Sequence, residues 1–449
     1  MREKFQTLMN NLRPAQMIVG YYIIVVTIST LLLCLPVAIK NHAHWTFMDA
    51  LFTAVSAVSV TGLTTVNFAE TFTITGLFIL IFILQIGGIG IMALGTFFWI
   101  VLGKKIGLRE RRLIMTDQNQ MNLSGLVRLL KQLLVVFIMI ELMGALILGT
   151  YYLNYYPTWQ EAYLHGLFSS VTATTNAGFD ITGSSLIPFA NDYFVQFIHM
   201  VLITLGAIGF PVLIEVVDYF KKRKETFHFT LYTKIATLMY LILVLFGGLG
   251  FLLFEWNHFL HDKIWHESLF YAFFQSVSTR SGGLVTLDLT HLSDATLMLL
   301  SCLMFIGASP SSVGGGIRTT TFAIIILFLY HYSRGNQAIK IFKREIHEGD
   351  VVKAFVVSIF AVMVCFGSVV LLCFTEDVPV ITLIFEVCSA FGTSGMSLGI
   401  TAELSNIGKI IIMLLMFIGR VGILTFLLMI GGKEKKENFH YPKERVIIG

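Results

Sequence analysis

The sequence predicts an all-α polytopic membrane protein in which four tandem repeats share one central axis with pseudo-fourfold symmetry. Three observations support this fold class: a very apolar composition, long apolar runs between charged loops, and a local motif that recurs four times. Of the 449 residues, 56% are hydrophobic and 13% are charged, and the mean hydropathy is +0.79. Soluble domains carry about 25% charged residues, so the composition excludes an ordinary soluble protein.

The longest apolar runs can cross a bilayer as helices. Residues 17–39 and 351–374 are examples, and about 20 apolar residues span the hydrocarbon core. Long runs separated by charged loops are typical of helices and not of barrel strands. The basic stretch 1–16 is not followed by the short apolar core and small-residue cleavage site of a signal peptide. We therefore interpret residues 17–39 as an uncleaved first span.

A local pattern recurs four times along the chain. A phenylalanine is followed ten residues later by a glycine, which comes after a small residue and before a large apolar one. The four glycines are 116, 105 and 112 residues apart. Four matches at a nearly constant period indicate a fourfold internal repeat. The glycines are Gly62, Gly178, Gly283 and Gly395.

Each of these glycines ends an apolar segment that is too short to span a membrane. A helix of about 12–16 residues covers about 20 Å, roughly half to two-thirds of the apolar thickness. Such a segment has to enter and return on the same side. Pro157 and Pro379 stand at the start of two of the segments, which suits the first turn of a helix. We therefore predict four helix–pore-helix–helix repeats around one central pore.

Charged loops mark the boundaries of the repeats. Positive charge gathers in 103–112, 221–224, 340–345 and 433–445, so we expect these segments and both termini to be cytoplasmic and the short segments to lie on the outer side. The expected organisation is a cytoplasmic N-terminus at 1–16, repeat 1 at 17–103, a cytoplasmic linker at 104–124, repeat 2 at 125–221, a linker at 222–229, repeat 3 with a broken last helix at 230–332, a linker at 333–350, repeat 4 at 351–432 and a cytoplasmic C-terminal tail at 433–449.

The backbone around the four glycines is a candidate ion-selectivity filter. Irregular backbone at membrane depth is tolerated only where protein buries it or where it lines a cavity. Four such segments around an axis can form a ring of carbonyl oxygens that replaces the water shell of an ion. Packing between helices explains scattered glycines such as Gly247, but not four at matched positions. The predicted filter residues are Val60, Thr61, Gly62, Asn176, Ala177, Gly178, Ser281, Gly282, Gly283, Thr393, Ser394 and Gly395.

The four motifs carry a family resemblance over essentially the whole chain. They are SVTGL (59–63), TNAGF (175–179), TRSGGL (279–284) and GTSGM (392–396). With them the sequence resembles the membrane subunit of a bacterial Ktr-type potassium transporter of the Trk/Ktr/HKT superfamily. The resemblance implies a bacterial plasma membrane protein that binds potassium through filter backbone carbonyls. A serine in place of Gly62 goes with sodium selectivity in related transporters, so Gly62 implies potassium. We expect Arg280, inside the third motif, to turn away from the ion path and pair within the protein.

A small-residue cluster follows each glycine by 24–28 residues, at 85–92, 205–213, 305–322 and 417–426. Only the third is predicted to break its helix, because proline and three consecutive glycines weaken it. A simple kink would need fewer small polar residues. The resemblance implies a loop that obstructs the pore below the filter, held closed by Arg420. The alternative for Arg318 is a place near the cytoplasmic boundary, where its long side chain snorkels. The predicted gate comprises Ser309, Pro310, Ser311, Ser312, Val313, Gly314, Gly315, Gly316 and Arg420.

Other features limit the remaining function classes. No catalytic constellation stands out, so we do not expect an enzyme, and no GxGxxG motif indicates a nucleotide-binding domain in this chain. Histidines 258, 261 and 266 suit a solvated loop better than a zinc site. The resemblance implies a homodimer with one pore per subunit and a separate cytosolic ring of nucleotide-binding regulatory subunits, with the basic inner loops as docking surface. We expect contacts with membrane lipid, none with nucleic acid, and no cofactor in this chain.

The predicted function is potassium uptake through a channel-like pore. The alternative is a sodium-coupled carrier, which would more often show broken helices at corresponding positions of two halves; the sequence predicts a clear break only in the third repeat. The end of the chain adds a structural hypothesis. Residues 446–448 are aliphatic after a charged stretch, and an apolar end of this kind can dock in a dimer interface.

Overall fold

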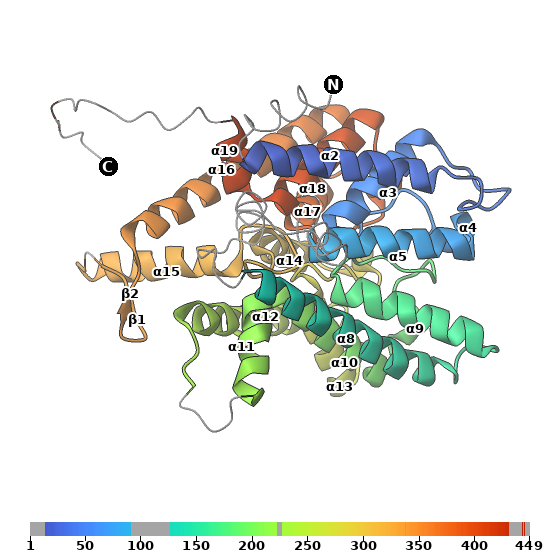
Figure 1. Cartoon of the computed structure of the whole chain (residues 1–449), viewed down its shortest axis with the longest axis horizontal. Coiled ribbons are helices and arrows are strands. Elements are labelled where there is room, and N and C mark those ends of the chain that lie inside the picture. Colours follow the sequence, from blue (N-terminus) through green and yellow to red (C-terminus); the bar gives the residue numbers. More distant parts are fainter. Residues whose placement is uncertain are drawn as a thin grey trace.

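The computed structural model describes residues 14–90, 126–221, 227–336 and 338–430, together with Pro442 and Glu444 in the tail. The predictions made for most of the cytoplasmic N-terminus, the linker at 104–124 and the docking of residues 446–449 lie outside the described residues. Helices dominate the described part (Figure 1).

The same order of elements occurs four times: a long helix, a shorter helix that ends at a predicted filter motif, one turn of helix, and another helix of 13 to 16 residues, which a further helix follows in the last three repeats. The first repeat contains α2 (Pro14–Leu33), α3 (Phe47–Ser59), α4 (Phe68–Thr71) and α5 (Ile74–Ile89). The second contains α8 (Leu126–Tyr152), α9 (Trp159–Thr174), η1 (Ile187–Phe189), α10 (Tyr193–Ala207) and α11 (Phe210–Lys221). The third contains α12 (Leu231–Glu255), α13 (Trp265–Ser278), η2 (Leu289–His291), α14 (Asp294–Ile306) and α15 (Thr319–Ser333). The fourth contains α16 (Glu348–Thr375), α17 (Val380–Gly392), η3 (Ile400–Ala402), α18 (Asn406–Val421) and α19 (Ile423–Ile430).

The shorter helices have the lengths expected of half-spans. α3, α9, α13 and α17 contain 13, 16, 14 and 13 residues, fewer than the roughly 20 that a bilayer needs. Their starts are fixed locally: Thr46 and Asp49 form a capping box on α3, and the side chain of Thr158 caps α9. The two prolines stand just outside the helices and not in the first turn, because Thr158 follows Pro157 as the cap and Pro379 is itself the cap of α17.

Helices long and apolar enough to cross a membrane number four in the described ranges: α2, α8, α12 and α16. Two bent pairs add a span each if a pair is counted as one crossing. The chain bends by 103° between α10 and α11 and by 101° between α18 and α19. The prediction that only the third repeat contains a clear break is therefore wrong. The chain is a polytopic helical membrane protein with bent, re-entrant-like helix pairs.

The bends occur at glycines that adopt left-handed backbone angles. Gly209 has φ 105° between α10 and α11, and Gly422 has φ 88° between α18 and α19. In the first repeat α5 ends at Gly90, with φ 96°. Residues with side chains rarely adopt such angles, whereas glycine does so at little steric cost. One glycine is therefore enough to turn the chain where the sequence otherwise reads as one apolar run.

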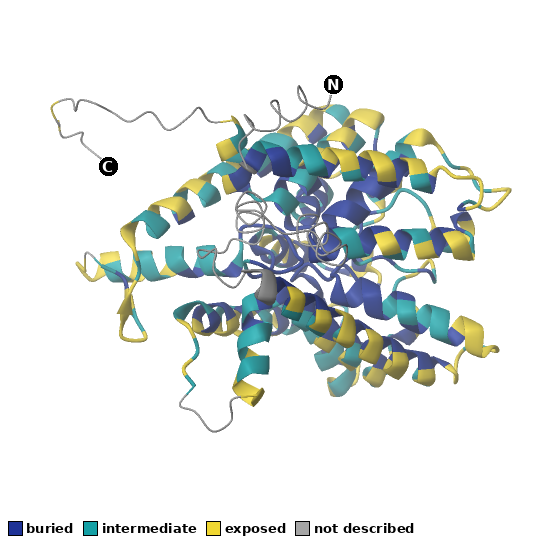
Figure 2. Ribbon diagram, in the orientation of Figure 1, coloured by how far each residue is buried: buried dark blue, intermediate teal, exposed yellow. Residues whose placement is uncertain are grey.

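The centre of the molecule is buried and the outer helix faces are not (Figure 2). The four shorter helices converge there, and their last turns are almost entirely buried. Large apolar side chains stand on the outer faces of the long helices; Leu253 of α12 is 74% exposed and Phe374 of α16 is 91% exposed. This distribution fits a protein surrounded by lipid, in which apolar side chains face outward and polar groups gather inside.

A short hairpin lies between the third and fourth repeats. Its strands are β1 (Lys340–Ile341) and β2 (Arg344–Glu345), joined by Phe342 and Lys343 with φ 49° and 59°. Positive φ at both central residues gives the turn type that suits tight hairpins. The hairpin and the end of α15 lie at one end of the molecule, on the left of Figure 1, and α4 lies at the other. The predicted cytoplasmic segment 340–345 is therefore far from the loops predicted to be outside.

Candidate functional site

The four filter motifs share one backbone conformation. In each motif the glycine and the residue two positions before it have positive φ, whereas the residue between them does not. Alternation of left- and right-handed backbone turns successive carbonyl groups to the same side, as an oxygen-lined ion path requires. For residues other than glycine this conformation costs about 1–3 kcal/mol each. The pairs are Val60 (57°) and Gly62 (97°), Asn176 (53°) and Gly178 (66°), Ser281 (66°) and Gly283 (71°), and Thr393 (47°) and Gly395 (87°).

The four glycines pack against one another in a closed ring. A Cβ atom at Gly62 would lie 3.1 Å from the Cα of Gly178, and one at Gly178 would lie 2.8 Å from the Cα of Gly283. A Cβ atom at Gly283 would lie 3.4 Å from the Cα of Gly395, and one at Gly395 would lie 3.0 Å from the Cα of Gly62. The structure thus brings together, in cyclic order, four residues that are more than 100 positions apart in the sequence.

At each of these contacts a carbonyl oxygen of the neighbouring segment also lies against the glycine. The oxygen nearest to Gly62 is that of Ala177, and the oxygen nearest to Gly283 is that of Ser394. The carbonyl of Thr61 lies against Gly395 in the same way. Each is the carbonyl of the residue immediately before a ring glycine. No ring position has room for a side chain, so the glycines are required by their backbone angles and by their neighbours.

Hydrogen bonds from the shorter helices hold two of the segments in the same way. The Gly62 amide donates to Ser56 Oγ at 3.1 Å, and the Gly395 amide donates to Ser389 Oγ at 3.1 Å. Both serines lie six residues before their glycine. The sequence analysis missed them, although this shared spacing would have revealed them. Asn176 anchors the second segment differently, since its amide can donate to Ala173 O at 2.8 Å and to Ile203 O at 3.1 Å.

A cavity of about 480 Å³ opens on one side of the ring. All four ring glycines line it, and so do the carboxylates of Asp180 and Asp288, while no lysine or arginine is among the described residues in its wall. Burial raises the pKa of Asp180. Hydrogen bonds from the hydroxyl and amide of Thr290 lower the pKa of Asp288. An acidic mouth attracts cations, and the sequence analysis did not single out either aspartate.

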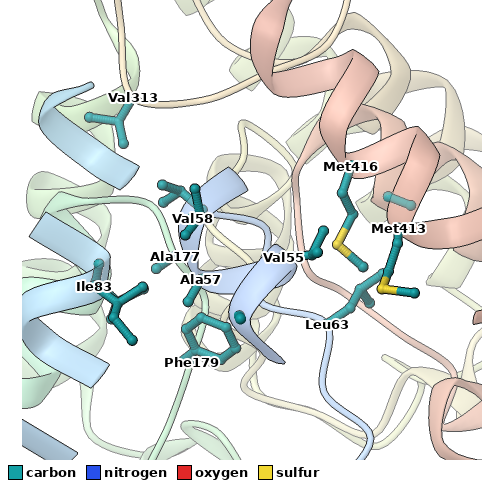
Figure 3. Packing of buried hydrophobic residues seen from close by; sticks show 14 of the residues in the cluster. Val55, Ala57, Val58, Leu63, Ile83, Ala177, Phe179, Val313, Met413 and Met416 are labelled. Carbon is teal, nitrogen blue, oxygen red and sulfur yellow. The ribbon is translucent and has the colours of Figure 1, made fainter. Parts of the chain in front are cut away.

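The segment between α14 and α15 lies directly against the other side of the ring. A Cβ atom at Gly314 would lie 2.6 Å from Cβ of Ser281, and one at Gly315 would lie 2.6 Å from Cγ2 of Thr393. Figure 3 shows Val313 in the same buried cluster as Val58 and Ala177. The predicted gate residues 309–316 are therefore next to the predicted filter residues.

Backbone hydrogen bonds attach this loop to the bend of the second repeat. Ser309 N donates to Ala207 O at 3.0 Å, and Phe210 N donates to Ser311 O at 2.7 Å. The hydroxyl of Tyr232 donates to the carbonyl of Pro310. Within the loop, Ser312 Oγ donates to Ser309 O at 2.6 Å. Irregular backbone at this depth is stable because protein groups satisfy it.

Two arginines also hold the loop. Arg420 donates to the carbonyl oxygens of Val313 and Gly87, and to that of Gly88 at 3.2 Å. Arg318 donates to the carbonyl of Gly314 and to that of Ser309 at 3.4 Å. Arg318 is therefore turned toward the loop and does not snorkel. Both side chains line a second cavity, of about 260 Å³, on the far side of the loop from the ring.

The buried Arg280 is turned away from the ring. Its side chain is completely buried, and its guanidinium donates to the carbonyls of Leu303 and, at 3.3 Å, Gly307. These carbonyls are at the end of α14, and that of Leu303 also accepts the amide of Gly307 at 3.3 Å. The expectation that Arg280 pairs within the protein is confirmed. Its partners are backbone oxygens at the break in the third repeat.

The histidines between α12 and α13 lie in local side-chain pairs. Among the described residues, no group of three histidine, cysteine, aspartate or glutamate side chains is placed to hold a metal ion. His258 instead lies 3.0 Å from a carboxylate oxygen of Glu255, and His261 lies 2.9 Å from that of Asp262. These are local side-chain pairs at the ends of helices and loops.

Known proteins resemble the whole chain. Ktr system potassium uptake protein D of Bacillus subtilis (strain 168) is 60% identical over 449 residues, with all of both chains covered. Ktr system potassium uptake protein B of the same organism is 35% identical over 443 residues, which is 97% of this chain and 96% of that one. The crystal structure of the potassium transporter TrkH from Vibrio parahaemolyticus matches with a TM-score of 0.72 at 20% identity, covering 93% of this chain and 84% of that one.

The family follows from these comparisons and from the geometry together. The fold of the Vibrio transporter is the fold of this chain, and the two Bacillus proteins are similar to it from end to end. The model of the protein family TrkH, described as cation transport protein, matches residues 4–441 of the chain. The protein is therefore a transporter and not an enzyme, and it belongs to the TrkH family of cation transport proteins.

Proposed function

We propose that the protein takes up potassium across the bacterial plasma membrane through a channel-like pore whose selectivity filter is the ring of four glycines. The closed cycle of contacts among Gly62, Gly178, Gly283 and Gly395 is the observation that carries the proposal. One chain supplies all four quarters, so each subunit has its own pore. Potassium binds to the backbone carbonyls of the filter residues, which replace its water shell. The names of the two Bacillus relatives support potassium as the ion.

The loop 309–316 is the gate in this proposal. It lies against the ring, and its backbone is held by Arg420 and Arg318 and by the bend of the second repeat. Opening requires the loop to leave this position. Shortening the loop should raise potassium flux and weaken its dependence on regulation. Unchanged or lower flux in a well-folded shortened variant would show that the loop does not obstruct the pore.

The proposal also includes the partner subunits of the chain and its orientation in the membrane. The chain forms a homodimer under a separate cytosolic ring of nucleotide-binding regulatory subunits, and both termini are cytoplasmic. The word "system" in the names of the Bacillus relatives supports a partner subunit. The separation of the basic hairpin at 340–345 from the acidic mouth supports the orientation. The nucleotide belongs to the regulatory subunit, and potassium is the transported ion.

The bent helix pairs favour a second candidate. Carriers often have broken helices at corresponding positions of two halves, and α10–α11 and α18–α19 bend by nearly the same angle, 103° and 101°. The breaks in the second and fourth repeats therefore keep a sodium-coupled carrier under consideration. In a channel-like pore, by contrast, the bends make room for the loop below the ring.

Uptake into proteoliposomes separates the two functions. The purified protein is reconstituted, and labelled potassium is followed with and without an inward sodium gradient at the same membrane potential. A channel-like pore takes up potassium down the electrical gradient without sodium. A carrier accumulates potassium only with the sodium gradient. Empty liposomes measure the leak, and a result with no potassium uptake in either condition, by protein shown to be folded, would contradict both functions.

A further inference from the structure

The second repeat holds the end of its pore helix differently from the first and fourth. In those repeats a serine hydroxyl six residues before the glycine accepts the amide hydrogen of that glycine. The residue at this position in the second repeat is Thr172 of α9. Its hydroxyl is buried and has no hydrogen-bond partner among the described residues. A buried polar atom without a partner is costly, so this hydroxyl requires an explanation.

Two more buried polar atoms without partners lie at the same place. They are Oη of Tyr152, at the end of α8, and Nε2 of His199, in α10. The hydroxyl of Ser169, which lines the same cavity, lies beside Oη of Tyr152. Tyr152 is 1% exposed and His199 is completely buried. Tyr152, Thr172 and His199 all line one small cavity of about 10 Å³, together with Phe179 and Asp180, which directly follow the ring glycine of this repeat.

The chemistry of the three atoms is complementary. His199 Nδ1 lies 2.7 Å from the carbonyl oxygen of Val195, which can only accept, so Nδ1 carries the proton. In the neutral ring Nε2 is then an acceptor that needs a donor. The hydroxyls of Tyr152 and Thr172 can each donate or accept. One molecule that donates two hydrogen bonds and accepts others would satisfy all three side chains.

Water is the molecule that fits. A cavity needs about 10–15 Å³ to hold a water, which should have two to four polar partners, and both conditions are met. A potassium ion needs a larger shell of oxygens, and an anion would face the lone pair of His199 Nε2. His199 lies seven residues before the glycine of α10 that packs on the end of the pore helix α9. The residues at the same distance before the matching glycines of the first and fourth repeats are apolar: Leu80 and Ile412.

We propose that the cavity holds one ordered water molecule, which accepts a hydrogen bond from Tyr152, donates one to His199 Nε2 and bonds the hydroxyl of Thr172. The water links α8, α9 and α10 behind the segment that leaves the ring at Gly178. At Ser56 and Ser389 the hydroxyl accepts the amide of the ring glycine directly, whereas the hydroxyl of Thr172 bonds the water. The second segment of the ring is thus anchored by the amide of Asn176, and the water supports the helices behind it.

A high-resolution map of the full-length wild-type protein in lipid nanodiscs tests the proposal directly. Density for one water is expected within hydrogen-bonding distance of the three polar atoms. A map that resolves other buried waters but leaves this cavity without density would overturn the proposal. The map does not depend on transport, so a water found in a protein that fails to take up potassium would leave this inference intact and contradict only the proposed function.

A double-mutant cycle gives a second, independent test. Tyr152→Phe and Thr172→Val each remove one hydroxyl, and the two hydroxyls are not hydrogen-bonded to each other. If they share a water, the loss in thermal unfolding temperature of the double variant is smaller than the sum of the two single losses. Additive losses would contradict a shared water. Thr150→Val on the same helix is the control, because its hydroxyl bonds only to helix carbonyls on the exposed face.

Transport gives the functional consequence, which rests on the proposed filter. His199→Leu places in the second repeat the residue found at the corresponding position of the first, and removes the acceptor for the water. The potassium-to-sodium preference of uptake is expected to fall about tenfold, the effect of losing one buried hydrogen bond. An unchanged preference would show that the water does not support the ring, and Thr150→Val should leave the preference unchanged.

Discussion

The guanidinium of Arg420, at the end of α18, donates to the carbonyl oxygen of Val313 in the loop below the ring. The same guanidinium reaches the carbonyls of Gly87 and Gly88 at the end of α5. One side chain therefore connects the fourth repeat, the loop of the third and helix α5 of the first. A charged side chain at membrane depth is expensive and is expected to serve function.

Arg420→Gln should open the pore more often. The amide cannot replace a charged, forked donor that contacts several carbonyls. Loss of such bonds is worth about 1.5–3 kcal/mol, so potassium flux in proteoliposomes without the regulatory subunit should rise about tenfold or more. Arg334→Gln is the control, since Arg334 is exposed and its guanidinium lies over the ring of Tyr330, at 4.4 Å. Equal potassium flux in wild type and Arg420→Gln would show that Arg420 does not hold the loop closed.

Gly62→Ser should weaken the preference for potassium over sodium. Its φ of 97° is strained for serine, and a Cβ atom would collide with the backbone of Ala177 and Gly178. The ring must then widen or distort at one quarter. The measurement is the ratio of labelled rubidium to sodium uptake. Gly399→Ser is a matched control, because Gly399 has φ 91° and lines the same outer cavity but has open space around it. Wild-type selectivity in Gly62→Ser would reject the four-glycine ring.

Acidification of the outer side should slow uptake through Asp180. Burial raises the pKa of Asp180, whereas hydrogen bonds from Thr290 lower that of Asp288. As the pH falls, Asp180 therefore takes up a proton first and the mouth loses negative charge, while Asp288 stays ionised to lower pH. Because charge at the mouth raises the local cation concentration, initial uptake at low ionic strength should fall a few-fold over that range.

Two neutral variants check this order of titration. Asp180→Asn should be slower than wild type at neutral pH and should lose the first fall on acidification. Asp288→Asn should also be slower but should keep that fall. Asp262→Asn, in an exposed outer loop where it pairs with His261, is the control. A pH profile that persists unchanged in Asp180→Asn would assign the titration to another group.

Removal of residues 446–449 tests the predicted dimer contact of the tail. Three aliphatic side chains gain about 1.5–3 kcal/mol each when fully buried, enough to order a short segment. Light scattering of the detergent-solubilised protein should show a dimer for the full chain and a weaker dimer after truncation. An equally stable dimer without residues 446–449 would exclude the tail from the interface, and a monomeric full-length protein would reject the dimer.

The four-part plan could be predicted from sequence because its signals are local. α3, α9, α13 and α17 end three to five residues before their ring glycines, as the motif predicts. Their short length follows from the positions of caps such as Thr46 and Thr158. The broken span at 293–332 was predicted for the same reason, because proline and three adjacent glycines disfavour a helix whatever surrounds them.

The bends and the polar contacts could not be predicted because their partners are distant in sequence. A single glycine in an apolar run, such as Gly209, usually stays helical. Here its bend is stabilised by Phe210 N donating to Ser311 O, about 100 residues further along. Arg280 donates to the carbonyls of Leu303 and Gly307, which lie 23 and 27 residues further along the chain. The partnerless atoms of Tyr152 and His199 share a cavity that only the packed helices create.

The ring of four glycines is encoded once in a single gene product, not four times by identical subunits. A substitution in a symmetric tetramer changes every quarter together, whereas here one codon alters one quarter and leaves three intact. The residues before the ring glycines already differ, being Thr61, Ala177, Gly282 and Ser394. Ion preference can therefore drift by small, separately heritable steps, and a library that varies these four positions independently would sample gradations that no homotetramer can reach.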